Sequence, residues 1–371
     1  MARLSRGEVI DPSEVSIVHV INRTVRRCFL FGDDPISGKN FDHRKVWIEE
    51  LLEHFSACFG IDLLCFAILS NHYHLILRSR PDVVASWDDS EVARRWLLIC
   101  PLRKVDGKPA VPTEPELNSI RNCPVKLAEA RQRLSNISWW MRLLNQRIAQ
   151  RANRQEEEMG RFWQDRFRAI RIIDEESLMA CAAYVDLNPI RAGLAETIEA
   201  SDHTSVQRRI ETRQQLAAAS QDTSVETNST VSQSDSALPT LTPEQRRDRF
   251  LAQLTIDEAK DPTGPVASQT SFRCSDKGFL SISTDAYFEL LDWTARQLRP
   301  DKPGSTPADA PPVLKRLGLG KPAWLALVAS FEELFCHLAG RCDRIDAERS
   351  YRTGRRFRVR PSARKLLTSA A

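Results

Sequence analysis

The chain has 371 residues, of which 42% are hydrophobic and 27% are charged, and its formal net charge is +4. This length is enough for about two folded domains, and the composition excludes a mainly disordered chain. No apolar run approaches the roughly 18 residues of a membrane span, so we expect no membrane partner. The nine cysteines are scattered without CxxC pairs, and the N-terminus lacks the apolar stretch of a secretion signal. These features predict reduced thiols and a cytoplasmic protein.

The first third of the chain predicts alternating strands and helices. Residues 14–22 are rich in β-branched side chains and predict a strand, whereas residues 41–59 show helical apolar spacing and end before Gly60. A nearly continuous apolar run at 61–69 predicts a buried strand. After a short turn, a further strand follows to about Arg78.

That further strand contains two histidines, His72 and His74. Alternate residues of a strand point to the same face, so both imidazoles are expected on one side of the sheet. Two such side chains are half of a divalent-metal site, or simply one core or surface histidine beside another. His19, in the first strand, competes as a third ligand, as a phosphate contact or as a satisfied core histidine.

Residues 81–126 are rich in proline and predict an insertion or extended surface excursion with one short helix at 90–99. A helix is predicted again at 127–152, and a fourth strand at 167–173. Arginines recur from Arg131 to Arg171, which indicates either a solvated helix face or a footprint for phosphates. The candidate DNA contacts are Arg23, Arg142, Arg147, Arg151 and Arg168.

Residues 174–188 predict a helix that carries Tyr184 and Asn188. Asp174 fits its N-cap, and Pro189 should end it near Asn188. At 100° per residue Tyr184 lies about 110° from the predicted core stripe, so it is expected outside the core. Asn188 is four residues further on and therefore shares nearly the same face.

The predicted order of elements is β-α-β-β-α-β, followed by this extra helix. It indicates the α+β class and a ferredoxin-like core, in which the first and third strands are central neighbours. The histidine pair would then lie in the middle of the sheet, with the tyrosine-bearing helix free to pack over it.

The rest of the chain predicts a second unit. We assign residues 1–210 to the first domain, with its insertion at about 81–126, and residues 211–242 to a flexible polar linker. Residues 243–371 form a mainly helical region with helices expected at 243–254, 285–298 and 323–339. Its basic end, 349–365, is either a nucleic-acid contact or a solvated tail.

Three motifs carry a resemblance to a known family. They are Asn71-His-Tyr-His-Leu-Ile-Leu77, Trp163-Gln-Asp-Arg-Phe167 and Tyr184-Val-Asp-Leu-Asn-Pro-Ile-Arg-Ala-Gly-Leu194. Together with His19 and Arg23 in the first strand, they resemble the REP-associated tyrosine transposases of the HUH single-strand DNA transposase superfamily. The resemblance spans roughly residues 15–209, and the long excursion at 81–126 and the C-terminal region lie outside the family pattern.

The resemblance implies a metal-dependent endonuclease and transposase that acts on single-stranded or hairpin DNA. Tyr184 matches the family's nucleophile, which forms a covalent 5′-phosphotyrosine. His72, His74 and Asn188 match the ligands of a Mg²⁺ or Mn²⁺ ion. The alternative is a non-cleaving hairpin DNA-binding regulatory protein on the same fold. A metallohydrolase that uses the histidine pair without covalent catalysis is a third reading, and it would leave Tyr184 without a role.

Overall fold

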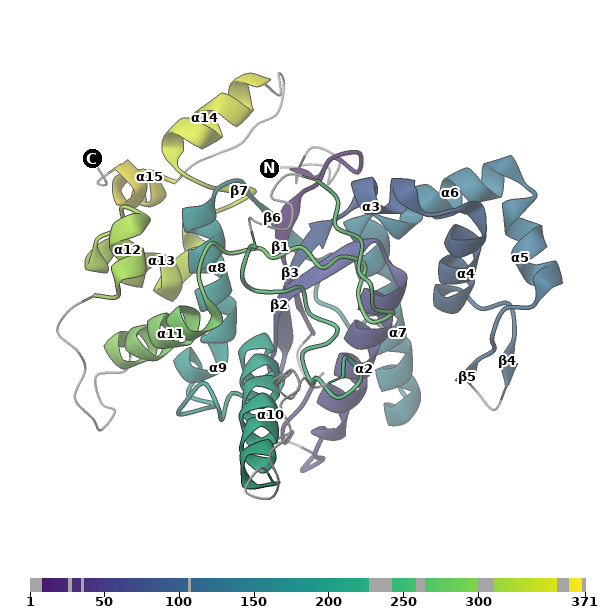
Figure 1. The fold of residues 1–371 in the computed structure, drawn as a ribbon, viewed down its shortest axis with the longest axis horizontal. Coiled ribbons are helices and arrows are strands. Elements are labelled where there is room, and N and C mark those ends of the chain that lie inside the picture. The colour runs from purple at the N-terminus through teal and green to yellow at the C-terminus, as the bar shows by residue number, and fades with distance from the viewer. Residues whose placement is uncertain are drawn as a thin grey trace.

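The computed structural model describes residues 9–25, 29–34, 37–105, 108–226, 242–257, 264–298, 310–351 and 360–368 (Figure 1). The chain has a mixed α/β structure built on a five-stranded mixed sheet with the order β2-β3-β1-β6-β7. The strands are β1 (Ile17–Arg23), β2 (Ile61–Ile68), β3 (His72–Ser79), β6 (Arg168–Ile172) and β7 (Leu338–Ala339).

The strand register decides which side chains share a face of the sheet. β1 pairs antiparallel with β3, with Ile21 opposite His74 and Arg23 opposite His72. Directly opposed residues lie on the same face, so His72, His74 and His19 all point to one side of the sheet. Tyr73 lies on the other side, where it is buried.

Helices cover both faces of the sheet. On the Tyr73 face lie α2 (His43–Cys58) and α7 (Ile137–Glu156), which share one hydrophobic core with the strands. On the histidine face lie α8 (Glu175–Asp186), α11 (Thr284–Leu298) and α13 (Lys321–Leu334), which form a second core (Figure 1). The sheet is therefore the middle of three layers.

The excursion after β3 is helical rather than extended. It contains α3 (Pro81–Ser86), α4 (Asp89–Ile99), α5 (Glu114–Arg121) and the two short strands β4 (Lys104–Val105) and β5 (Lys108–Pro109), and it projects from the core (Figure 1). The single helix predicted at 127–152 is divided into α6 (Pro124–Leu134) and α7. The division falls at Asn136, whose side chain accepts a hydrogen bond from the Ser138 amide and so begins a new helix.

The C-terminal region contributes to the core sheet. β7 pairs in parallel with β6, where Arg171 is opposite Leu338, and it lies inside the range predicted as one helix at 323–339. Further helices are α12 (Pro312–Arg316), α14 (Cys342–Tyr351) and α15 (Pro361–Thr368). The predicted helix at 243–254 is wrong: this segment runs as turns along β2, where the Ala252 amide donates to the Leu63 carbonyl.

Part of the predicted linker is helical, because α10 (Ser205–Glu226) continues past residue 211. Residues 227–241 lie outside the described part of the chain, as does 352–359 of the basic tail. The division into two domains therefore stays a prediction. The eight cysteines among the described residues carry free thiols, and none of the described helices combines the length and apolarity needed to cross a membrane.

Candidate active site

Tyr184 and the histidines meet on one face of the sheet. The Tyr184 ring centroid is 5.5 Å from that of His74 and 5.8 Å from that of His19, with both pairs edge to face. α8 brings the tyrosine there from an N-cap formed by Asp174, whose carboxylate accepts from the Ser177 amide as predicted.

Tyr184 is buried, with 5% of its surface exposed, which corrects the expectation that it lies outside the core. Every residue of α8 from Ser177 to Asp186 is buried, because the C-terminal helices cover the side that the sequence left open. Phe331 of α13 lies 5.9 Å from the Tyr184 ring, and the Tyr184 hydroxyl donates to Glu332 Oε1 at 2.6 Å. The phenol is thus held between the sheet and α13.

His74 sits at the centre of a buried polar chain. Its Nδ1 lies 3.1 Å from His19 Nε2, and its Nε2 lies 3.2 Å from the amide nitrogen of Asn188. Burial lowers the pKa of His74 well below its usual value and that of His19 to about 3, with the charge of Arg168 adding to the effect on His19. Both rings are therefore neutral, and the 3.7 Å approach of Glu332 to His74 is not an ion pair.

His72 marks the more open end of the site. Its ring is 5.0 Å from that of His74, and its Nδ1 lies 2.7 Å from Asn71 Oδ1. Burial and the nearby charge of Arg23 lower the pKa of His72 to about 4, so this imidazole is also neutral at pH 7.

Asn188 reaches His74 from a position that differs from the predicted one. α8 ends at Asp186, and Asn188 begins the short helix α9 (Asn188–Arg191), with Pro189 in its first turn. Proline suits this position because the first turn needs no amide donor. The break turns the chain, yet it leaves the Asn188 amide in contact with His74.

The donor atoms fit a weakly held divalent ion. Among the described residues no group of three or more His, Cys, Asp or Glu side chains is arranged to hold a metal. The Asn188 atom that lies 3.2 Å from His74 Nε2 is the amide nitrogen, so Asn188 would have to turn its side-chain amide to offer its oxygen to an ion beside His74. His72, on the same face of the sheet, would supply a third donor atom.

Two arginines and Glu332 complete the surroundings. Arg168 pairs with the Glu332 carboxylate at 3.4 Å and donates to the Phe335 carbonyl at 2.7 Å, which fixes the end of α13. Arg191 stacks over the Tyr184 ring at 4.5 Å and donates to the Ala329 carbonyl, also in α13. Sequence reasoning missed Glu332; its signal is a pair of glutamates at 332 and 333 that interrupts an otherwise apolar helix.

Burial raises the pKa of Tyr184 well above its usual value, and the charge of Glu332 raises it further. The phenol is therefore protonated at neutral pH in this arrangement. The site therefore contains a hydrogen-bonded phenol rather than a phenolate.

The arginines predicted to contact DNA have different surroundings. Arg23 is exposed at the end of β1 opposite His72, and Arg142 and Arg151 are exposed on α7, each over a tryptophan ring. Arg147 is partly buried, donates to the Ile99 carbonyl and stacks on Phe55, while Arg168 is engaged with α13. The structure thus leaves Arg23, Arg142 and Arg151 open to solvent and gives Arg147 and Arg168 internal partners.

No protein-family model matches this chain, and no curated protein matches it. Among solved structures, a REP-associated tyrosine transposase bound to a REP hairpin is similar at 11% identity and a TM-score of 0.33. That similarity covers 57% of this chain and 86% of the other. A similarity this distant supports no functional conclusion.

Proposed function

We propose that the chain is a metal-dependent single-strand DNA endonuclease and transposase that acts on hairpin DNA through a covalent 5′-phosphotyrosine. The observation that carries the proposal is the meeting of Tyr184 with His74 and Asn188 on one face of the sheet. His74 comes from one motif, and Tyr184 and Asn188 come from another that begins 110 positions later in the sequence. Packing of the tyrosine alone would not explain the buried polar contacts that His74 makes with His19 and Asn188 beside it.

The order of the strands supports a ferredoxin-like core. β6, β1, β3 and β2 are neighbours in that order and are antiparallel, and β1 and β3 are central among these four. This is the arrangement in which a β-α-β-β-α-β chain closes its sheet. It leaves one face for α2 and α7 and the other for the helix that carries the nucleophile.

In the proposed reaction the Tyr184 oxygen attacks the scissile phosphorus. The phenol O–H bond breaks, a bond from the tyrosine oxygen to phosphorus forms, and the bond from phosphorus to the 3′-oxygen breaks. The proton lost by the phenol balances the proton that the leaving oxygen takes up to become a free 3′-hydroxyl. His72, His74 and Asn188 would hold a Mg²⁺ or Mn²⁺ ion, which supplies charge neutralisation at the phosphate. The Tyr184 hydroxyl must be freed from α13 before the attack, because Phe331 and Glu332 cover it.

The test uses the full chain with end-labelled hairpin DNA that carries single-stranded arms, in the presence of Mn²⁺. A protein–DNA adduct that survives a denaturing gel is the expected product, and Tyr184→Phe should abolish it. Tyr351→Phe is the matched control, because Tyr351 is 79% exposed on α14, away from the site. Cleavage without an adduct that persists in Tyr184→Phe would show the hydrolase that uses the histidines alone.

A second function is supported by the closure of the site. Both nitrogens of His74 have partners, and Tyr184 is covered, which also suits a hairpin DNA-binding regulatory protein that does not cut. Hairpin binding at ordinary salt without any adduct, in Mg²⁺ and in Mn²⁺, would select this alternative. The cytoplasmic location expected from the cysteines is proposed with either function.

A further inference from the structure

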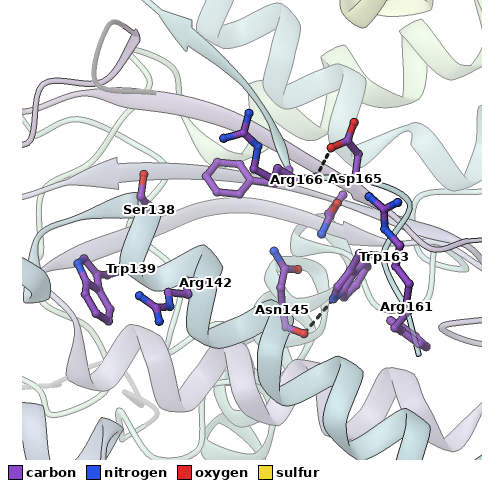
Figure 2. Close-up of a pocket in the computed structure, with 11 residues that line it drawn as sticks. Ser138, Trp139, Arg142, Asn145, Arg161, Trp163, Asp165 and Arg166 are labelled. Carbon is purple, nitrogen blue, oxygen red and sulfur yellow. Dashed lines mark hydrogen bonds between the residues drawn. The ribbon is translucent and has the colours of Figure 1, made fainter. Parts of the chain in front are cut away.

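A groove on the Tyr73 face of the sheet, opposite the histidines, is lined by tryptophans and arginines (Figure 2). It lies between α7 and the segment that precedes β6, and its volume is about 610 Å³. This volume falls within the roughly 300–1,000 Å³ typical of small-ligand sites. Its lining includes the side chains of Trp139, Arg142, Asn145, Arg161, Trp163 and Arg166.

The tryptophan walls of the groove are held in place by the protein. Trp163 donates its indole N–H to the Asn145 carbonyl at 2.9 Å, as Figure 2 shows, and its ring packs edge-on against Tyr73 at 5.5 Å. Trp139 is partly exposed, and the guanidinium groups of Arg133 and Arg142 lie over its ring, 4.5 and 4.8 Å from the centroid. Fixed, partly exposed indole faces are suited to stacking on nucleobases.

The polar groups of the groove favour an anionic ligand. Arg142, Arg161 and Arg166 are exposed, and within the described part of the chain none of these three side chains forms an ion pair. Asp165 is the acidic residue of the lining, so positive charge is in excess. The Asn145 side-chain oxygen accepts from the Tyr73 hydroxyl at 2.5 Å, which leaves its amide N–H groups to donate to a ligand.

The groove begins where the candidate active site ends. Asn22 lines the groove and lies opposite Tyr73 in the sheet, whereas the next residue, Arg23, lies opposite His72. Because neighbouring residues of a strand face opposite sides, the same end of β1 presents the groove on one face and the histidines on the other. A backbone that leaves the histidine side can cross this end over Arg23 and enter the groove.

We infer that the groove binds unpaired nucleotides of single-stranded DNA, the arm that flanks the hairpin next to the scissile phosphate. Trp139 and Trp163 would stack on bases, and Arg142, Arg161 and Arg166 would contact phosphates. The inference rests on the proposed function for the identity of the DNA. Binding to the groove, however, requires no cleavage.

The experiment therefore measures binding in the full-length Tyr184→Phe chain, which cannot form the adduct. The probes are one labelled DNA hairpin with a single-stranded arm, the same hairpin without the arm, and an RNA copy of the armed hairpin. Trp139→Ala should weaken binding of the armed hairpin by roughly 5- to 150-fold, the range expected for one lost stack. It should leave the armless hairpin unchanged.

Arg142→Ala tests the phosphate contact, and Arg154→Ala is its matched control. Both arginines are exposed on α7, but Arg154 lies outside the groove. Arg142→Ala should reduce the slope of log affinity against log salt by about 0.7 for the armed hairpin, and Arg154→Ala should not.

Equal losses for armed and armless hairpins, or equal effects of the two arginine variants, would overturn the assignment of the groove. Tighter binding of the RNA copy would overturn its assignment to DNA. If the wild-type chain forms no adduct but these binding differences are observed, the proposed nuclease activity is rejected and the assignment of the groove is retained.

Discussion

Replacing Glu332 by glutamine tests whether α13 restrains the nucleophile. The Tyr184 hydroxyl donates to this carboxylate at 2.6 Å, and the carboxylate charge also raises the pKa of Tyr184. Glutamine keeps the shape and can still accept from the hydroxyl, but it carries no charge. The change therefore removes the electrostatic part of the restraint without opening a cavity.

The size of the effect follows from the type of hydrogen bond. A hydrogen bond to a charged group contributes about 1.5–3 kcal/mol and a neutral one about 0.5–1.5 kcal/mol. The difference, about 1–1.5 kcal/mol, corresponds to adduct formation roughly 5- to 13-fold faster if opening of this contact precedes the attack. The loss of negative charge beside the incoming phosphate acts in the same direction.

The assay is the initial rate of adduct formation on a labelled hairpin in Mn²⁺. Glu333→Gln is the control, because Glu333 carries the same charge on the same helix but is exposed. A Glu332→Gln rate equal to wild type would show that the contact does not restrain the phenol. A slower rate would show instead that Glu332 accepts the phenol proton and does not restrain the nucleophile.

Three further outcomes follow from the structure. His19 has its pKa lowered to about 3 by burial, so the unfolded state binds its proton first as pH falls below about 6.5. The free energy of unfolding should then fall by up to about 1.4 kcal/mol per pH unit, and denaturant unfolding at pH 7, 6 and 5 should show a flatter profile for His19→Asn. Tyr287→Phe removes the hydrogen bond of 2.7 Å from the Tyr287 hydroxyl to buried Asp186 and should cost about 1–3 kcal/mol by the same method, whereas a change near zero would show that α11 is not docked on α8 in solution. Chelation of divalent ions should abolish the adduct and leave the thermal midpoint unchanged, because the donor set forms no closed structural site; a large drop in the midpoint would contradict this.

Outside residues 81–136, most elements of the first 200 residues could be predicted from the sequence, because each has a strong periodic or compositional signal. β2 is apolar throughout, and the side chains of β3 alternate so that both histidines share a face with His19. The N-cap at Asp174 was equally readable. The meeting of Tyr184 with the histidines followed from the order of the elements, and the structure confirms it.

The surroundings of the nucleophile could not be predicted in this way. Tyr184 lies off the apolar stripe of its helix, formed by Leu178, Cys181, Ala182 and Val185, and the sequence assigns only that one face to the core. The other face of the Tyr184 helix is buried by α13, which lies about 140 residues further along the chain. Nothing in the local sequence of either helix indicates that the two pack together. The two residues of β7 were likewise hidden at the end of an apolar helical pattern, because a strand this short has no periodicity of its own.

The parallel pairing of β6 with β7 also has a consequence for folding. It joins strands from opposite halves of the chain, and a contact of this kind forms late because a long loop must first be closed. During synthesis the strands and the tyrosine helix leave the ribosome well before α13 and β7 exist. The nascent chain therefore carries its phenol uncovered, and translation of the final third both completes the sheet edge and shuts the site.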